Sequence, residues 1–278
     1  MPSYQQQVLD AAGYLQSRIG SSDMGILTGT GLGESIDALG MEESIAYGEI
    51  PGFPEPTVES HYGKLAAGDV QNQRVVAMQG RFHLYEGYSA LEVTFPIRVM
   101  QAMGVNTLLL SNAAGGINLD FVSGDIMVIA DHINLTGENP LVGENIDDWG
   151  PRFPDMTKVY DPGLMQTAEK AAQDSGFSLQ KGIYTGLKGP SLETPSETRF
   201  LQRIGGDAVG FSTVLEAIAG VHAGMKILGL STITNINDPD RPQPASVDDI
   251  IAVAAEAAAR HAGIIEAVAR ELGSNAAD

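Results

Sequence analysis

Residues 24–33 read MGILTGTGLG, a short apolar run that leads directly into a glycine-rich turn. Large aliphatic side chains are typical of a buried strand, and the glycines after them end it. The same pattern recurs along the chain, where most short aliphatic runs end in a polar or glycine-rich turn. We therefore predict strands at residues 24–27, 73–78, 107–110, 126–129, 182–185, 208–211 and 226–232.

Amphipathic segments alternate with these runs and predict helices at residues 4–19, 90–103, 164–174, 195–204, 215–223 and 247–272. The last helix starts with Ser246 and Asp249 at the spacing of a capping box and continues rich in alanine. Residues 137–160 hold three prolines and the sole tryptophan, and they predict a long irregular loop. Because no repeat or low-complexity linker interrupts the alternation, we predict a single α/β domain over residues 1–278.

The composition limits the classes of partner. The chain has 278 residues with 16 basic and 35 acidic side chains, a net charge of −19. This acidity disfavours nucleic acids and anionic membranes as partners. No run approaches the ~20 apolar residues of a membrane span, and the first residues do not resemble a signal peptide, so we expect a cytoplasmic protein. With no cysteine, disulfides, thiolate metal sites and a cysteine nucleophile are excluded.

The glycine-rich turn is the first candidate site. Its glycines allow backbone N–H groups to converge on an anion, and the Thr30 hydroxyl adds a further donor. It is not a Walker loop, and Glu34 occupies the position of the last glycine in a dinucleotide fingerprint. Taken alone, the sequence is equally compatible with a plain tight turn.

A second candidate is GRFHLYEGY at residues 80–88. If the chain stays extended here, Arg81, His83 and Tyr85 share one face, opposite Phe82 and Leu84. Arginine offers a fork that suits phosphate, and histidine offers a further donor. We favour a ligand site over a structural salt bridge, because three such side chains on one face are costly to arrange without a ligand.

Three further motifs are weaker. They are SNAAGG at 111–116, KGPSLETPSE at 188–197 and STITNIND at 231–238. Small residues let a ligand approach backbone amides, and Asn235 carries the donor and acceptor that suit the edge of a heterocycle. A packing turn, a helix N-terminal charge at Glu193 and an Asx-turn explain the same residues equally well. The five histidines lack the spacing of a zinc site, so we predict no metal.

Taken in order, these segments resemble the trimeric family of purine nucleoside phosphorylases, from about residue 25 to the C-terminal helix. Each motif is weak alone, but their co-occurrence in this order is specific. The pieces that carry the resemblance are GTGLG at 29–33, PGFP at 51–54, His61 followed by Gly63, GRFHLYEGY at 80–88, NAAGG at 112–116, RFP at 152–154, GPSLET at 189–194 and ITN at 233–235.

The resemblance implies a mixed, partly closed central sheet flanked by helices. It also implies a pentosyltransferase of purine salvage that uses phosphate to cleave purine ribonucleosides or deoxyribonucleosides, giving the free base and α-(deoxy)ribose 1-phosphate. Inosine and guanosine are the expected substrates, and inorganic phosphate is a co-substrate, with no cofactor required. A cytoplasmic homotrimer is the assembly that the resemblance implies.

Site residues follow from the matching positions. The resemblance assigns phosphate binding to Thr30, His61, Arg81, His83, the Ala113 backbone and Ser212. It places Tyr85 near the sugar and Phe153 over the ribose of a neighbouring subunit. Its catalytic set is His83, Glu193 and Asn235. The other nucleoside-binding residues that it implies lie around the base, except Val247 near the sugar 5′-hydroxyl: Tyr184, Leu192, Glu193, Val209, Phe211, Asn235 and Val247.

Three positions depart from the family pattern. Leu192 replaces the usual aromatic residue, and Phe211 stands where methionine is common. Val247 occupies the place that often supplies a histidine for the sugar 5′-hydroxyl, and an apolar residue there is typical of 5′-methylthioadenosine phosphorylases. The alternatives are therefore a 5′-methylthioadenosine, methylthioinosine or xanthosine phosphorylase, or a non-catalytic purine-binding protein. The missing fingerprint disfavours a nicotinamide-dependent oxidoreductase.

Overall fold

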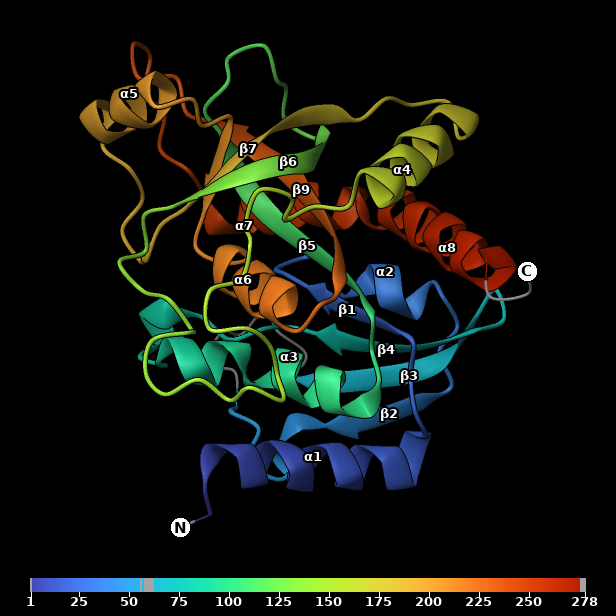
Figure 1. Cartoon of the computed structure of the whole chain (residues 1–278). Coiled ribbons are helices and arrows are strands. Elements are labelled where there is room, and N and C mark those ends of the chain that lie inside the picture. The colour runs from blue at the N-terminus through green and yellow to red at the C-terminus, as the bar shows by residue number, and fades with distance from the viewer. Residues whose placement is uncertain (1, 56, 58–62, 276–278) are drawn as a thin grey trace.

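The computed structural model describes residues 2–55, 57 and 63–275 (Figure 1). Within them, a nine-stranded mixed sheet has the strand order β2-β3-β4-β1-β5-β8-β7-β6-β9. The strands are β1 Met24–Thr28, β2 Glu43–Ala46, β3 Lys64–Val70, β4 Gln73–Gln79, β5 Thr107–Gly116, β6 Ile126–Asn134, β7 Gln180–Gly186, β8 Ala208–Gly210 and β9 Lys226–Ile236.

Helices cover both faces of this sheet. They are α1 Tyr4–Ile19, α2 Glu34–Asp37, α3 Ala90–Met103, α4 Pro162–Asp174, α5 Pro195–Arg203, α6 Val214–His222, α7 Val247–Glu256 and α8 Ala258–Asn275, with 3₁₀ turns η1 Tyr47–Glu49 and η2 Leu84–Glu86. The bounds predicted for α1 and α3 are confirmed. Capping fixes their starts, because Ser3 accepts from the Gln6 amide and Ser89 forms a capping box with Glu92.

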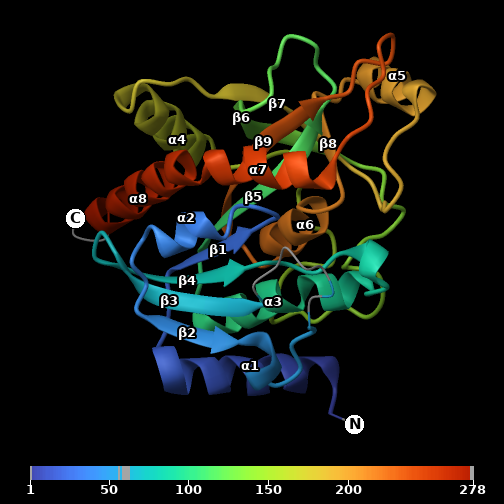
Figure 2. The same cartoon turned by 180° about the vertical axis from the view of Figure 1, so that it is seen from behind.

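The central strands are buried on both faces, which explains why they are continuous apolar runs rather than alternating ones. On β1, Met24 and Ile26 join the cluster that includes α2, α4 and α8, while Leu27 joins the cluster under α1, α3 and α6. Figures 1 and 2 show α1 and α3 on the side of the sheet opposite α8. The sheet is therefore the middle layer of a three-layer core.

Strand β5 is the branch point of the sheet. Its first residues pair with β1 and its last two with β8, while β9 runs along its whole length on the other side. Because β8 pairs with β7, β7 with β6, and β6 with β9, these five strands close into a ring. Figure 2 shows β5 passing from the group of β1 and β4 into this ring. The predicted mixed, partly closed sheet is confirmed.

The sequence-based prediction missed some elements and gave other bounds to some of those that it found. The short strands β2 and β3 and the helix α2 were not predicted, and the helix predicted over 247–272 is broken at Ala257 into α7 and α8. Strands β5, β6 and β9 extend beyond their apolar runs into polar residues. Residues 137–160 form the predicted irregular loop. Among the described helices, none has the length and apolar character needed to cross a membrane.

Candidate active site

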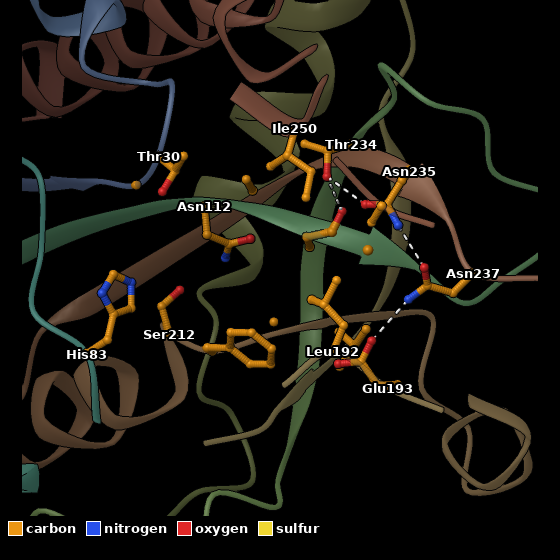
Figure 3. A pocket seen from close by; sticks show the side chains of 18 of the residues that line it. Thr30, His83, Asn112, Leu192, Glu193, Ser212, Thr234, Asn235, Asn237 and Ile250 are labelled. Carbon is orange, nitrogen blue, oxygen red and sulfur yellow. Dashed lines mark hydrogen bonds between the residues drawn. The ribbon is translucent and has the colours of Figure 1, made fainter. Parts of the chain in front are cut away.

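A cavity of about 370 Å³ lies where β1 and β8 leave the same side of β5 (Figure 3). Ligands of α/β sheets commonly bind at such a split, where loops from two strands diverge. The cavity brings together eleven of the predicted site residues: Thr30, Arg81, His83, Tyr85, Ala113, Leu192, Glu193, Val209, Phe211, Ser212 and Asn235. These residues come from both the open part of the sheet and the ring.

Arg81 follows β4 and lies at one end of the cavity. Its side chain is only 1% exposed and forms an ion pair with the equally buried Glu216 of α6, with 3.2 Å between Nη1 and Oε1. The guanidinium also donates to the Thr213 hydroxyl at 3.1 Å and to the carbonyls of Leu27 and Ser111. These contacts fix a cation in place before any ligand binds.

Thr213 stands at the start of α6 in a strained backbone conformation, with φ 74° and ψ −48°. A β-branched residue rarely adopts positive φ, and such strain persists only where neighbours hold it. Here the Thr213 hydroxyl accepts from Arg81 and from the Asn112 amide at 2.8 Å, and it lies 3.1 Å from the Ser212 hydroxyl. The positive end of the α6 dipole therefore lies next to the cavity.

His83 is fixed by Glu86. The Glu86 carboxylate accepts from the His83 Nδ1 at 2.8 Å and from its backbone amide at 2.9 Å, and it also accepts from Thr57. Burial raises the pKa of Glu86, but the hydrogen bonds from His83 and Thr57 outweigh burial and lower it to about 2. An ionised Glu86 makes Nδ1 the protonated nitrogen of His83 and sets the orientation of the ring.

Tyr85 packs on His83 with ring centroids 4.6 Å apart and makes a T-shaped contact with Phe211, with ring centroids 6.0 Å apart. Burial is the main cause that raises the pKa of Tyr85 to about 12, so its hydroxyl stays protonated. The chain does not stay extended through this motif, because it turns into η2 at Leu84. Even so, Arg81, His83 and Tyr85 all line the cavity as predicted, while Phe82 and Leu84 do not.

The glycine-rich turn lies between β5 and α7. A Cβ at Gly29 would approach the Asn112 Cα to 3.2 Å, and one at Gly31, where φ is 73°, would lie 2.7 Å from the Ala254 Cβ. Both positions therefore require glycine if the turn is to fit this space. The close packing places Thr30 at the cavity wall, half-buried, beside the Asn112–Ala113 segment of β5.

The opposite end of the cavity holds a line of hydrogen bonds at the end of β9 (Figure 3). The Thr234 hydroxyl donates to Asn235 Oδ1 at 3.0 Å, and Asn235 Nδ2 donates to Asn237 Oδ1 at 2.7 Å. Asn237 Nδ2 then donates to Glu193 Oε2 at 3.1 Å. Burial is the main cause that raises the pKa of Glu193. This end thus offers amide donors and a carboxylate, flanked by apolar Leu192 and Phe211.

Three of the predicted residues that the structure describes do not line this cavity. Tyr184 is fully buried behind it, where its hydroxyl accepts from the Ser212 amide at 3.4 Å. Phe153 is 86% exposed and lines a separate cavity with His132. Val247 begins α7 and is 69% exposed, whereas Ile250, one turn later, lines the main cavity. His61 lies outside the described residues.

Several cavity residues were not predicted as site residues. Asn112, Thr234 and Asn237 lie inside motifs that the sequence had already marked, so their proximity to Ala113 and Asn235 was the available signal. Gln243, Pro244, Ala245 and Ile250 follow those motifs and carry no such signal. In the part of the chain that the structure describes, no group of three or more histidine, aspartate or glutamate side chains could hold a metal ion.

The chain matches the model of a family described as the Phosphorylase superfamily, over residues 23–270. Purine nucleoside phosphorylase 1 of Bacillus subtilis is 47% identical over 259 residues, which are 93% of this chain and 96% of that protein. The purine nucleoside phosphorylase of Bos taurus is 45% identical, covering 84% of this chain and 83% of that protein.

Among solved structures, isoform 2 of the Schistosoma mansoni purine nucleoside phosphorylase, in complex with cytosine and ribose-1-phosphate, has a TM-score of 0.90. It is 41% identical and covers 96% of both chains. The chain therefore belongs to the Phosphorylase superfamily and, within it, to the purine nucleoside phosphorylases. It is an enzyme, as predicted.

Proposed function

We propose that this enzyme cleaves 6-oxopurine nucleosides, inosine and guanosine above all, with inorganic phosphate as the co-substrate. One observation carries the proposal: a single cavity joins a buried, fixed arginine at one end to a carboxylate and two amides at the other. The first end suits a phosphate, the second suits the hydrogen-bonding edge of a purine, and a ribose fits between them.

Phosphate binding falls to Arg81, His83, Thr30, Ser212 and the Ala113 backbone in this proposal. The first four bring N–H and O–H donors to one end of the cavity. His61 belongs to the same set by sequence, although it lies outside the described residues. Because Arg81 and His83 are each held by a carboxylate, little reorganisation accompanies the binding of an anion.

The reaction itself follows from this placement. A phosphate oxygen forms a bond to C1′ while the C1′–N9 bond breaks and its electron pair moves to the purine. The sugar passes through an oxocarbenium-like state, which the adjacent phosphate dianion stabilises, so no covalent protein nucleophile is needed. Asn235 donates to the ring nitrogen on which the departing purine gathers negative charge.

Glu193 provides the discrimination between bases in the same proposal. Ionised, it accepts from the N1–H of a 6-oxopurine, whereas adenine presents a lone pair at N1. A mismatched buried hydrogen bond of this kind discriminates by about 10⁴-fold or more. Tyr85 lies near the sugar, and Leu192, Val209 and Phe211 pack around the base, with Tyr184 supporting the wall from behind.

Assembly, location and cofactor use are also proposals. We propose a homotrimer in which Phe153 covers the ribose of a neighbouring subunit, and the 86% exposure of this large apolar side chain supports it. We place the enzyme in the cytoplasm, within purine salvage, with small molecules as its only other partners. The proposed reaction uses phosphate as the nucleophile and assigns no step to a metal or cofactor.

A second candidate function is phosphorolysis of 5′-methylthio nucleosides. Pro244, Ala245 and Ile250 give the cavity an apolar wall beside Gln243, and Val247, which lies outside the cavity, supplies no polar group to bind a 5′-hydroxyl. A wall of this kind would favour a 5′-methylthio group over a hydroxyl. The base end favours our first candidate, because Glu193 is matched to a 6-oxopurine.

A substrate panel tests both candidates. Inosine, guanosine, xanthosine, adenosine and 5′-methylthioadenosine are each incubated with and without phosphate, and the release of base and sugar 1-phosphate is measured. We expect turnover of inosine and guanosine only when phosphate is present. No turnover of these two would refute the proposal, and faster turnover of 5′-methylthioadenosine would establish the second candidate instead.

A further inference from the structure

Asn237 lies in the cavity between Glu193 and Asn235 and is one of the two amides of the base end, but no atom of the base has been assigned to it so far. Its backbone amide donates to the Gly116 carbonyl at 2.8 Å, which fixes the residue at the end of the β5–β9 pair. A Cβ at Gly115 would lie only 2.9 Å from Asn237 Nδ2. The lack of a side chain at Gly115 is therefore what gives the Asn237 amide its place.

The direction of the hydrogen bonds fixes which way this amide faces. The ionised Glu193 carboxylate only accepts hydrogen bonds, so Asn237 turns its NH₂ group toward Glu193. The Oδ1 of Asn237 consequently faces Asn235, which turns its own NH₂ group toward it. A flipped Asn237 would bring its oxygen against the carboxylate and its NH₂ against that of Asn235, which are two repulsive contacts.

An amide NH₂ carries two hydrogens, and the hydrogen bond to Glu193 uses only one of those on Asn237. The second hydrogen is available to a ligand in the cavity, which Asn237 lines. The order of the three side chains, Glu193 then Asn237 then Asn235, matches the order of groups along the edge of a 6-oxopurine. That edge presents N1–H, then the 6-oxygen, then N7.

We propose that Asn237 is a specificity-determining residue that donates its second Nδ2 hydrogen to the 6-oxygen of the base. This inference rests on the proposed function, in which Glu193 faces N1–H and Asn235 faces N7. A 6-amino group at the same place would set donor against donor. Asn237 therefore adds a second point of rejection for adenosine, beside the mismatch at Glu193.

The test compares inosine with 6-thioinosine, which keeps the N1–H and changes only the acceptor at position 6. Sulfur is a weak acceptor, so it gains little from an amide donor. For Asn237→Ala we expect kcat/KM for inosine to fall about 10- to 100-fold. We expect the fall for 6-thioinosine to be several-fold smaller. Asn106→Ala, at a surface asparagine before the start of β5, is the matched control.

Equal losses for both nucleosides would overturn the inference, because Asn237 would then act only by positioning Glu193 and Asn235. No loss for inosine would overturn it as well. Asn237→Asp is the second variant, in case the alanine variant does not fold, and it should lower the inosine-to-adenosine ratio of kcat/KM by replacing a donor with an acceptor. An unchanged ratio contradicts the inference. A wild-type enzyme without activity on inosine would refute the proposed function instead.

Discussion

The two ends of the cavity are built in opposite ways. At the phosphate end, Arg81 and Glu216 are each 1% exposed, and the guanidinium is held by Glu216, the Thr213 hydroxyl and the Leu27 carbonyl. At the base end, half-buried amides form a line of single hydrogen bonds, and Leu192 is 54% exposed. The end that we assign to the invariant phosphate is therefore tightly held, while the end that we assign to the variable base has more freedom to adjust.

The buried ion pair makes the phosphate end of the cavity hard to alter. A buried ion pair adds little net stability over an apolar pair, but removal of one partner leaves a charge without compensation in the core. Removal of one amide from the line of hydrogen bonds at the base end leaves polar groups that water can still reach. Changes at the phosphate end should therefore affect folding and catalysis together, whereas changes at the base end should affect specificity.

The largest effect is expected from Arg81→Met. Activity should fall by about 10³-fold or more, because a fixed cation beside the phosphate is lost. The free energy of unfolding should fall by about 3–5 kcal/mol, since Glu216 is left buried and unpaired. Phosphate-dependent kcat/KM and urea unfolding measure the two effects.

The double variant Arg81→Met with Glu216→Leu is the control for that result. It should recover most of the stability, because no buried charge remains, but none of the activity. If the double variant regained activity along with stability, the ion pair would be structural and the phosphate role of Arg81 would be wrong.

Asn235→Asp tests the base end. The change replaces an amide donor with a carboxylate oxygen, so kcat/KM for inosine should fall about 100-fold, while preference shifts toward 6-aminopurine nucleosides. Stability should change little, because the side chain is only partly buried. An unchanged inosine-to-adenosine ratio in the kinetic assay would contradict the role assigned to Asn235.

A smaller, pH-dependent effect is expected from Glu86→Gln. Because the pKa of Glu86 is lowered from 4.5 to about 2 in the folded state, its ionised form stabilises the fold above pH 4.5. This contribution is lost as the pH falls from about 4.5 toward 2. Near neutral pH the variant should be about 1–2 kcal/mol less stable than the wild type.

Chemical unfolding at a series of pH values measures that difference. The gap between wild type and Glu86→Gln should stay constant above about pH 5 and narrow below pH 4.5. A gap that is the same at pH 3 and pH 7 would mean that Glu86 does not gain stability from its charge. His83 would then be oriented by other contacts.

The smallest effect is expected from Leu192→Phe at the exposed rim of the base end. An aromatic ring there stacks on the purine, which adds about 0.5–1 kcal/mol. The KM for inosine should fall about two- to fivefold with little change in kcat. Leu192→Met, a change of similar volume without a ring, serves as the control and should leave KM unchanged.

The fold could be predicted from the sequence wherever local signals and burial agree. The bounds of α1 and α3 follow from caps and periodicity, and the apolar runs located β1, β4 and β9. Strand β3 was missed because KLAAGDV is poor in β-branched residues, and it is set by pairing with β4. No helix-breaking residue in the sequence marks the break at Ala257. The break arises because α7 packs on the Gly31 turn while α8 packs on α4.

The candidate site likewise combines residues that local motifs reveal with residues that only the fold brings together. Residues within recognisable motifs, such as Arg81 and Asn235, were predicted and line the cavity. The role of Asn237 depends on the space left by Gly115, which is close in the ring and distant in sequence. Val247 was placed at the site by the resemblance to the family, yet the helical turn presents Ile250 to the cavity instead. Such three-dimensional relations leave no pattern in a single sequence.

The three neighbours of β5 also have a consequence for how the enzyme becomes active. Its partner β9 lies far along the chain, so the ring can close only after most of the chain is available. Until closure, Arg81 and Glu193 lie on parts of the sheet that are not yet joined, so we expect no activity from a partly folded chain. A ligand that binds only the assembled cavity favours the closed ring by mass action. Ligands of this cavity should therefore raise the free energy of unfolding.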